Sequence, residues 1–554
     1  MPHFFDGDLR GEISVDGTDV ATSSIKPFDQ LTGAATTVLE EVAFGLERTG
    51  VTHEDIEPRA RDCLDRVGIA DLADRDPGTF SGGQLQRLAI ASVLDPDVLI
   101  LDEPTSQLDP AGTEAVFSLA ASMHEAGYTI VFVSQDLQRL APRADRLLVF
   151  ENGQLRYDDD PRTVFTRVAD TDRSDLVTVS ETLRVGRMLR DCGLYDGDPP
   201  LTVSELRART DLEALGMTIG HGPTDGSPSG ETAPSPPRLA GSRSSTLDSS
   251  ASDSSIPTAS GSDSFDSLDS PKSPDSTPSD GSQDDDPPLI DVENASHTYA
   301  SGTDALRDVS LTMDGGFVAV LGHNGAGKTT LAKHLNGLLT PTAGTVRIAG
   351  QETDQGRVAT FARTVGLCFQ NPDNQLFRPT VESEVRFGPE QLGYDRARTD
   401  GLMTDALSAL ELDGVRDTDT HDLGRALRRR VAIASVLAMD TAAIVLDEPT
   451  GGQDARGVTR IGDVVDDLVD AGRLVVLATH DVDFAADHAD RLVVLDDGTV
   501  VADDSPRAVY GSRRAAIEDA GVTAPIATQV ALALGADEVL VSAGELRSLL
   551  TTPE

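Results

Sequence analysis

The chain has 554 residues and a formal net charge of −47, from 93 acidic against 46 basic residues. Such a composition lacks the basic footprint of a nucleic-acid-binding protein, and we expect no nucleic acid among its partners. The three cysteines form no CxxC pair and no metal-ligand spacing, which argues against a disulfide framework or an iron–sulfur site. No apolar run is long enough to span a bilayer and the first residues carry no secretion signal, so we expect a cytosolic chain of two to four domains.

Residues 1–165 predict an α/β domain that carries one candidate anion cradle. The cradle is the turn Ser81-Gly82-Gly83-Gln84, which precedes a helical run. A serine hydroxyl, exposed glycine N–H groups and the positive end of the following helix can together bind phosphate. Farther along, an apolar strand ends in Asp102-Glu103, as expected of a buried parallel strand with functional acids at its carboxyl end.

Two segments of different composition follow the first domain. We assign residues 166–220 to a small extension of that domain. Residues 221–287 are mostly Ser, Pro, Asp, Gly and Thr. They hold too little apolar surface to offset the entropy of ordering, so we expect a disordered linker.

Residues 288–512 repeat the first domain, and residues 513–554 form a second small extension. The run from Leu99 to Thr105 matches the run from Ile444 to Thr450. A repeat on this scale indicates two copies of one architecture. Apolar strands rich in Val and Ile alternate with helical stretches rich in Ala and Leu, so each copy is predicted to be α/β with a mostly parallel core sheet.

The second domain carries a P-loop, in which glycine-rich backbone approaches phosphate closely. The loop is Gly322-His323-Asn324-Gly325-Ala326-Gly327-Lys328-Thr329, and we add the next residue, Thr330, to the predicted nucleotide-binding set. It follows an apolar strand and opens a helix, which is the context that this motif requires. Lys328 would reach the β- and γ-phosphates, and the Thr329 hydroxyl can ligate Mg²⁺.

Two acids follow the next buried strand of the second domain. Asp447 stands where a carboxylate can hold Mg²⁺, directly or through water, and Glu448 stands where it can orient or deprotonate an attacking water. With a P-loop upstream, a solvated strand end is the weaker interpretation of this pair.

The ordered set of a P-loop, Gln370, Asp447-Glu448 and His480 resembles an ATP-binding-cassette (ABC) ATPase, which has a P-loop NTPase-like core sheet and a helical subdomain. The resemblance implies ATP and Mg²⁺ as cofactors. In that family Gln370 would contact Mg²⁺ and sense the transporter, and His480 would lie at the γ-phosphate. Tyr299 would stack on adenine, although an ordinary half-buried ring is the alternative.

Each domain departs from the family at a different place. The first has no P-loop. Ile25 stands at the position of Gln370, the Q-loop residue, and Gln135 stands at the position of His480, the switch histidine. We expect the missing strand to leave the Asp102 strand with an exposed edge. In the second domain Arg425 stands in the signature sequence, where a bulky side chain opposes close approach of the backbone to phosphate.

In this family two cassettes pair head to tail, and each ATP lies between one P-loop and the opposite signature. The turn from Ser81 to Gln84 resembles an intact signature, so it would complete the site of the second P-loop. The other site would combine a missing P-loop with a broken signature. We therefore predict intramolecular pairing of the two cassettes around one working ATP site, with Asp109 reaching across as the D-loop residue of the first half.

Two further runs, from Gln370 to Phe377 and from Glu41 to Gly45, resemble the ATPase subunits of energy-coupling-factor importers for vitamins and for cobalt or nickel ions. The resemblance covers nearly all of the chain except the linker. It implies a transmembrane coupling subunit, a substrate-binding membrane subunit and a peripheral position on the cytoplasmic face of the plasma membrane. The acidic, lysine-poor composition also resembles proteins of salt-loving organisms, although a merely solvated surface is the simpler interpretation.

Two alternatives stay open on the sequence. A soluble tandem-cassette factor of translation or DNA repair would typically carry basic arms or cysteine clusters, and this sequence has neither. A decayed, non-catalytic homologue would keep the fold without turnover. If the natural start lies upstream of Met1, a first P-loop would precede it, and the prediction of a single site would fail.

Overall fold

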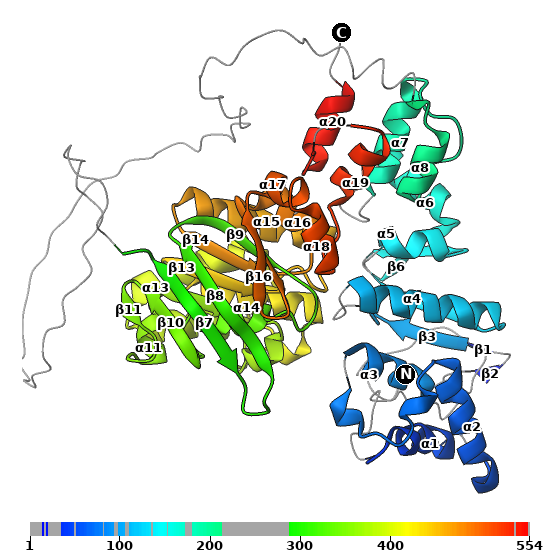
Figure 1. Cartoon of the computed structure of the whole chain (residues 1–554), viewed down its shortest axis with the longest axis horizontal. Coiled ribbons are helices and arrows are strands. Elements are labelled where there is room, and N and C mark those ends of the chain that lie inside the picture. The colour runs from blue at the N-terminus through cyan, green and yellow to red at the C-terminus, as the bar shows by residue number, and fades with distance from the viewer. Residues whose placement is uncertain are drawn as a thin grey trace, which may run out of the picture. The chain divides into compact units, whose positions relative to one another are not determined.

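The computed structural model shows two α/β halves, each followed by a small helical extension (Figure 1). It describes residues 14–15, 18–19, 35–48, 51–80, 82–92, 98–105, 110–134, 137–151, 153–171, 180–212, 287–536 and 539–551. The predicted linker lies outside the described residues except for Pro287. So do Ile25, Ser81, Asp109 and Gln135 from the sequence analysis.

The second half is built on a six-stranded sheet in the order β12-β13-β14-β9-β15-β16. Its strands are β9 (Gly316–Leu321), β12 (Val365–Cys368), β13 (Ala443–Asp447), β14 (Leu474–Ala478), β15 (Arg491–Asp496) and β16 (Thr499–Asp504). The first five strands in that order run parallel, and β16 returns antiparallel to β15. Every residue of β13 and β14 is buried, because both faces of a parallel sheet are covered.

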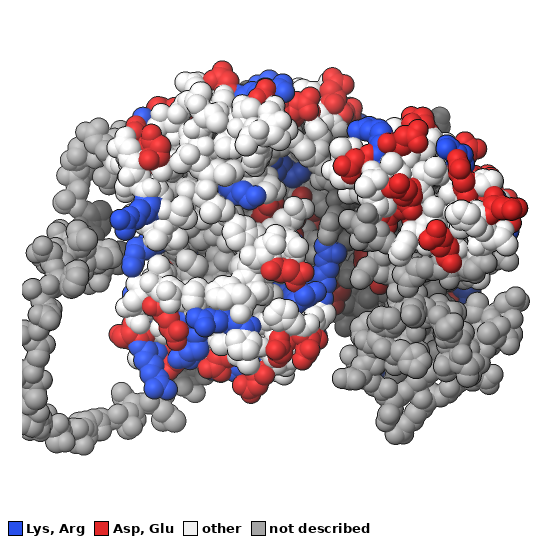
Figure 2. All heavy atoms as spheres, turned by 90° about the horizontal axis from the view of Figure 1, so that it is seen from below, with Lys and Arg blue, Asp and Glu red and all other residues white. Residues whose placement is uncertain are grey.

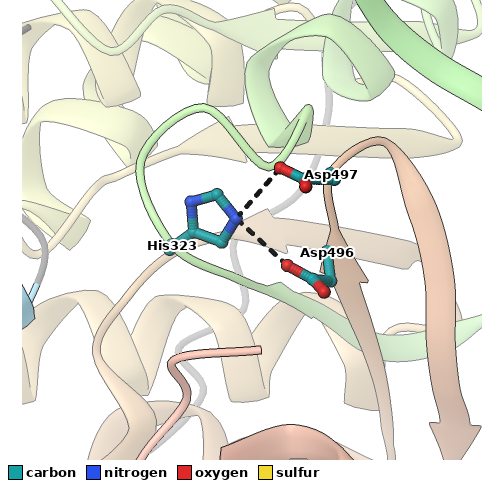
Figure 3. A group of neighbouring side chains, drawn as sticks. All are labelled: His323, Asp496 and Asp497. Carbon is teal, nitrogen blue, oxygen red and sulfur yellow. Dashed lines mark hydrogen bonds and ion pairs between the residues drawn. The ribbon is translucent and has the colours of Figure 1, made fainter. Parts of the chain in front are cut away.

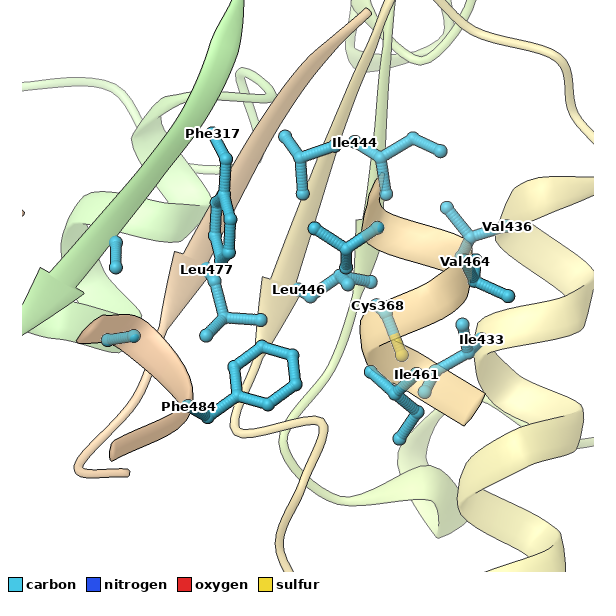
Figure 4. Close-up of a cluster of buried hydrophobic side chains, with 14 of the residues drawn as sticks. Phe317, Cys368, Ile433, Val436, Ile444, Leu446, Ile461, Val464, Leu477 and Phe484 are labelled. Carbon is cyan, nitrogen blue, oxygen red and sulfur yellow. The ribbon is translucent and has the colours of Figure 1, made fainter. Parts of the chain in front are cut away.

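Helices cover one face of this sheet and form the larger core. They are α12 (Val381–Leu392), α13 (Arg396–Ala409), α14 (Arg425–Leu437), α15 (Ala455–Asp470), α16 (Val482–His488) and α17 (Pro506–Tyr510). Figure 4 shows sheet residues such as Phe317, Leu446 and Leu477 packed with Ile433 of α14 and Ile461 of α15. This core fixes the helical layer against the strands that end at the site.

An antiparallel sheet and helix α10 cover the other face. The sheet has the order β11-β10-β7-β8. Its strands are β7 (Ile290–Thr298), β8 (Asp304–Met313), β10 (Ala343–Ile348) and β11 (Gln351–Glu352), and the helices on this side are α10 (Lys328–His334) and α11 (Val358–Phe361). Their apolar residues share a second core with β9, β13, β14 and β15.

The first half repeats the later strands and the helical layer of this plan. Its strands are β1 (Ser14–Val15), β2 (Thr18–Asp19), β3 (Val98–Asp102), β4 (Thr129–Val133), β5 (Leu147–Glu151) and β6 (Gln154–Asp159). Its helices are α1 (Val38–Arg48), α2 (His53–Arg66), α3 (Gly82–Ala91), α4 (Pro110–Glu125), α5 (Leu137–Leu140) and α6 (Pro161–Asp170). By the repeat, β3 to β6 correspond to β13 to β16.

The sheet of the first half is divided in two. In the second half β9 pairs with β14 on one side and with β15 on the other. Within the described part of the first half no strand corresponds to β9, and β3 pairs with β4 while β5 pairs with β6. We expected the missing P-loop strand to have been a neighbour of the Asp102 strand, β3. Because β9 pairs with β14 and β15, the strands of the first half that are without this neighbour are instead their counterparts, β4 and β5.

An apolar face of these strands is exposed as a result. Ile100 is 60% exposed and Phe150 is 62% exposed, whereas their counterparts Val445 and Leu495 are fully buried. Three further residues are exposed although their counterparts in the second half belong to the second core: Val131, Leu148 and Leu155. Within its described residues, the first half therefore has no counterpart of the layer that β7, β8, β10 and α10 provide in the second half.

Small helices follow each half. After the first half come α7 (Glu181–Asp191) and α8 (Val203–Arg209), which share a hydrophobic core with α19 (Ile526–Ala533) and α20 (Ala543–Thr551) after the second. Helix α18 (Arg514–Asp519) also follows the second half, and its Ile517 packs in the larger core of that half. Val185 and Leu206 of the first extension pack in one cluster with Val530 and Leu546 of the second. The boundary that we placed at residue 165 falls inside α6, whose Phe165 and Val168 are buried beside Leu183.

The exposed face leads to a prediction about stability. Phe150→Ser should change the free energy of unfolding by no more than about 0.5 kcal/mol, because the side chain is already largely in water. Leu495→Ser at the corresponding position should cost about 2–5 kcal/mol, because it opens a cavity in a packed core and buries a hydroxyl. Urea unfolding of the two full-length variants measures both values. A comparable loss from Phe150→Ser would mean that another part of the molecule covers this face.

Candidate functional site

The P-loop connects the central strand β9 to helix α10, as predicted. The helix begins at Lys328, the lysine of the loop. Gly322 and Gly327 have φ angles of 153° and 104°, and a Cβ atom on them would lie 2.4 Å from the carbonyl oxygen of Leu495 and 2.5 Å from that of Ala305. Only glycine allows the loop to lie this close to the neighbouring strands.

Lys328 is buried and directed into the loop. Its Nζ donates to the carbonyl oxygens of Gly322, at 2.7 Å, and His323, at 3.2 Å. The same atom lies 3.9 Å from Oε1 of Glu448, and both side chains are less than a tenth exposed. This buried pair of Lys328 and Glu448 connects the phosphate-binding loop to the end of β13.

Thr329 and Asp447 make the second link between the P-loop and β13. The Thr329 hydroxyl donates to Oδ2 of Asp447 at 2.8 Å. The other carboxylate oxygen, Oδ1, is buried without a hydrogen-bond partner. Burial raises the pKa of Asp447 to about 6, although the hydrogen bond from Thr329 opposes the rise. A threonine hydroxyl beside an unsatisfied carboxylate oxygen is a donor set that suits Mg²⁺.

Glu448 is held in one position by its backbone and by His480. Its φ angle is 53°, and its N–H donates to the carbonyl oxygen of Ala478 on the neighbouring strand, at 2.8 Å. Its Oε2 lies 2.8 Å from Nδ1 of His480 and accepts from the Thr479 hydroxyl at 3.3 Å. A left-handed glutamate is uncommon, and it is retained here because several bonds fix it.

The Glu448–His480 pair titrates as a coupled unit. Burial alone would raise the pKa of Glu448, but the hydrogen bond and charge of His480, with the charge of Lys328, leave it lowered. Burial alone would lower the pKa of His480, but the bond to Glu448 and its charge leave it raised. Each partner favours the charged form of the other, so Glu448 stays an ionised acceptor next to the phosphate loop.

Tyr299 and Gln370 lie at the periphery of this cluster. Tyr299 is in the turn between β7 and β8. Its hydroxyl is 3.0 Å from the Thr330 hydroxyl of α10, and the residue is 36% exposed, so the ring is both anchored and accessible. Gln370 follows β12 and is exposed, with its backbone carbonyl bonded to Arg429.

The side chain of His323 turns away from the phosphate cradle. Its Nδ1 lies 2.8 Å from the carbonyl oxygen of Asn324, and its Nε2 lies 3.2 Å from Asp496 and 3.8 Å from Asp497 in the turn between β15 and β16 (Figure 3). The ring thus faces the half-exposed carboxylate of Asp496 and the exposed carboxylate of Asp497. His323 can therefore contribute only its backbone to the cradle.

The first half repeats the backbone of the acid pair but not the phosphate loop. Glu103 has a φ angle of 46°, and its N–H donates to the carbonyl oxygen of Val133 at 2.9 Å, as Glu448 does to Ala478. Gly82 to Gln84 form the first turn of α3, where N–H groups lack partners within the helix. Ser81 and Asp109 lie outside the described residues, so the site shared between the halves stays a prediction.

On the face shown in Figure 2, acidic and basic side chains are intermixed over the larger coloured part, and acidic side chains predominate over the smaller one.

The assembled residues can bind a nucleoside triphosphate and hydrolyse it. The loop and Lys328 provide N–H groups and a positive charge for phosphate oxygens. Glu448 provides an ionised base within a fixed bond network, and His480 lies between that base and solvent. Sequence reasoning found these residues but gave Arg429 no role in the site, although an arginine within an apolar helix was visible in the sequence.

Comparison with known proteins gives the following matches. The profile of the ABC transporter family matches residues 6–106 and 306–451. A protein of Caldanaerobacter subterraneus, named as a candidate ABC transporter ATP-binding protein, is 31% identical over 90% of this chain and 81% of its own length. A protein of Methanosarcina acetivorans with the same description is 30% identical over 99% of this chain and 85% of its own.

One solved structure with similar sequence is cbiO1 from Clostridium perfringens, described as part of the ABC transporter complex cbiONQ. It is 31% identical over 42% of this chain and 94% of its own, with a TM-score of 0.38. A TM-score this low supports no structural inference.

The bond network predicts different effects for two substitutions. Glu448→Gln should lower turnover of triphosphate by at least about 100-fold, because it removes the base, and should leave binding within about threefold. Lys328→Ala should lower both, because it removes the charge that meets the phosphates. Phosphate release and equilibrium binding of a fluorescent ATP analogue measure the two quantities. Glu390→Gln, on the surface of α12, is the control, and turnover retained by Glu448→Gln would contradict the assignment.

Proposed function

The chain belongs to the ABC transporter family as an ATP-binding protein, and on this premise we propose that it hydrolyses ATP at one composite site to drive an importer of the energy-coupling-factor type. The single observation that carries the proposal is the bonded set of Lys328, Asp447, Glu448 and His480 around the P-loop. That set occurs in the second half only, since the first half has no P-loop in this sequence.

The catalytic roles follow from the contacts. Lys328 and the loop N–H groups neutralise the negative charge of the β- and γ-phosphates. Glu448 accepts a proton from, or orients, the water that attacks the γ-phosphate. His480 keeps Glu448 ionised and in place through the bond between Nδ1 and Oε2, and it is positioned to donate toward the departing phosphate. Tyr299 supplies an aromatic face for the adenine.

Mg²⁺ fits the donor set beside the loop. Thr329 and Asp447 would hold it, with Gln370 as a further oxygen ligand, and the unpartnered Oδ1 of Asp447 is the observation that supports this. When bound, the ion neutralises charge on the β- and γ-phosphate oxygens.

The signature of the first half would complete the site. Gly82 to Gln84 start α3, and with Ser81 they offer N–H and hydroxyl groups to the γ-phosphate, while Asp109 would reach across as the D-loop residue. In the second half the position of Gly82 is occupied by Arg425, the first residue of α14. The shared core of the two extensions supports pairing of the cassettes within one chain, because it joins them outside the site.

A transporter ATPase acts together with membrane-spanning subunits. Among the described helices none is long and apolar enough to cross a membrane. We propose a transmembrane coupling subunit and a substrate-binding membrane subunit, with the chain bound at the cytoplasmic face of the plasma membrane and a metal ion or vitamin as cargo. The support is the similarity of two sequence runs, Gln370 to Phe377 and Glu41 to Gly45, to energy-coupling-factor ATPases.

An exposed aromatic cluster near Gln370 is suited to contact such a partner. Phe377 is 59% exposed, and its ring meets the edge of Phe387 with centroids 4.8 Å apart. The Arg378 guanidinium lies over the Phe387 ring at 4.6 Å. Exposed aromatic and arginine side chains are enriched where proteins bind one another. A partner bound here would lie within a few residues of the Q-loop.

The composite site predicts an asymmetric response to substitutions in the first half. Ser81→Arg should lower ATP turnover by at least about tenfold, because it blocks the signature turn that meets the second P-loop. Glu103→Gln should change turnover by less than about twofold, because no P-loop of its own half faces it. Steady-state phosphate release by the full chain tests both. A large loss from Glu103→Gln alone would favour a second working site.

The aromatic cluster predicts an effect on membrane association. Phe377→Ser should reduce the fraction of the protein retained on membranes of its own cells by about tenfold, which is the size of a single interface hot spot. Val358→Ser removes a similarly exposed apolar side chain from α11 and serves as the control. Sedimentation with washed membranes measures retention. Equal retention of Phe377→Ser and the wild type would place the partner elsewhere, and stimulation of turnover by ribosomes or DNA would favour the soluble-factor alternative.

A further inference from the structure

Helix α14 of the second half carries a buried arginine that bonds the Q-loop. Arg429 is 4% exposed. Its Nη1 donates to the carbonyl oxygen of Phe369 at 2.6 Å, and its Nη2 donates to the carbonyl oxygen of Gln370. Nη1 also lies 3.5 Å from the carbonyl oxygen of Asp447, at the end of β13. One guanidinium therefore joins the Q-loop backbone to the strand that presents the catalytic acids.

The repeat shows that this arginine belongs to the second half alone. The run Gln86-Arg87-Leu88-Ala89-Ile90-Ala91-Ser92 aligns without gaps with Arg429-Arg430-Val431-Ala432-Ile433-Ala434-Ser435. The half with the intact signature thus has glutamine where the half with the P-loop has Arg429. Arg429 thus occurs in the half whose sequence has both a P-loop and a Q-loop glutamine.

A second side chain bonds the same loop to the same helix. Gln375 accepts from the N–H of Phe369 at 3.0 Å, and it donates to the carbonyl oxygen of Ala432 at 2.8 Å and to the Ser435 hydroxyl at 3.0 Å. Arg429, Ala432 and Ser435 are spaced by three residues and lie on one face of α14. The Q-loop backbone is therefore bonded to this face directly at Phe369 C=O and Gln370 C=O, and through the Gln375 side chain at Phe369 N–H.

We propose that Arg429 is a positioning residue for Gln370, which holds the Q-loop against the end of β13 in the half that keeps the working site. The inference rests on the proposed role of Gln370 as a ligand of the Mg²⁺ that accompanies ATP. Gln370 itself is exposed, so its side chain has no packing of its own to hold it. The guanidinium, which stays charged when buried among carbonyl oxygens, fixes the backbone from which that side chain extends.

Neighbouring arginines of α14 also bond other parts of the second half. Arg430 bonds Gln453 at 3.1 Å, and Arg428 bonds Asp373 at 2.7 Å. The first turns of this helix thus make bonds within their own half.

The test compares Arg429→Gln and Arg429→Lys with wild type in the full chain. Arg429→Gln installs the residue of the other half, which the same helix sequence accommodates there. It should lower kcat for Mg·ATP roughly tenfold, the equivalent of one lost charged hydrogen bond. It should leave KM for ATP within twofold and raise the Mg²⁺ concentration for half-maximal turnover several-fold. Arg429→Lys, which keeps the charge, should recover part of kcat.

A matched control and an active-site count separate positioning from folding. Arg398→Ala removes a half-exposed arginine of α13 that pairs with Asp440, away from this loop, and should leave kcat and Mg²⁺ dependence within twofold of wild type. Turnover is expressed per ATP-binding site, counted by equilibrium binding. The inference is overturned if Arg429→Gln has wild-type kcat and Mg²⁺ dependence, if its loss of kcat disappears when turnover is expressed per binding site, or if Arg398→Ala shows the same change. Failure of Glu448→Gln to stop turnover would instead refute the proposed function.

Discussion

Strand β9 is the element on which the rest of the structure depends. It pairs with β14 and with β15, so it joins the strands that carry the acids to the strands that close the sheet, and it ends in the P-loop. Where the chain has β9, one six-stranded sheet forms with a packed layer on each face. Where it lacks a counterpart in the described residues, the sheet divides into β3-β4 and β5-β6 and apolar side chains face solvent. The strand that ends in the P-loop therefore holds the sheet together as well as presenting the phosphate-binding loop.

The site depends on burial in the same way. Lys328, Asp447 and Glu448 are each less than a tenth exposed, and charges at that depth persist only when they are paired. Lys328 lies near Glu448, Thr329 bonds Asp447, and His480 bonds Glu448. Among the described residues, Oδ1 of Asp447 has no hydrogen-bond partner, and burial raises the pKa of this carboxyl group to about 6. Both features suit a carboxylate that binds a cation. The side chains of the site are thus held in place for phosphate and metal.

The two halves keep different parts of one ATP site. The first half keeps an intact signature turn and the backbone of an acid pair, including the left-handed glutamate, but has no phosphate loop. The second half keeps the phosphate loop and uses the helix of its altered signature for internal bonds, with Arg429 on the Q-loop and Arg430 on Gln453. On our proposal each half supplies what the other lacks, and the shared core of the extensions keeps the two within reach.

The sequence by itself determined the repeat, the α/β class and the chemical identity of the site, because the P-loop, Asp447-Glu448 and His480 are local patterns that follow apolar strands. It also predicted the strands that precede the P-loop and Asp447, which are β9 and β13, since buried strands are continuous apolar runs. Only the tertiary structure decided which strands pair with β9, that the Tyr299 hydroxyl meets Thr330, and that Arg429 reaches the Q-loop. Those facts depend on strand order and on contacts between residues far apart in the chain, which local composition and spacing do not encode.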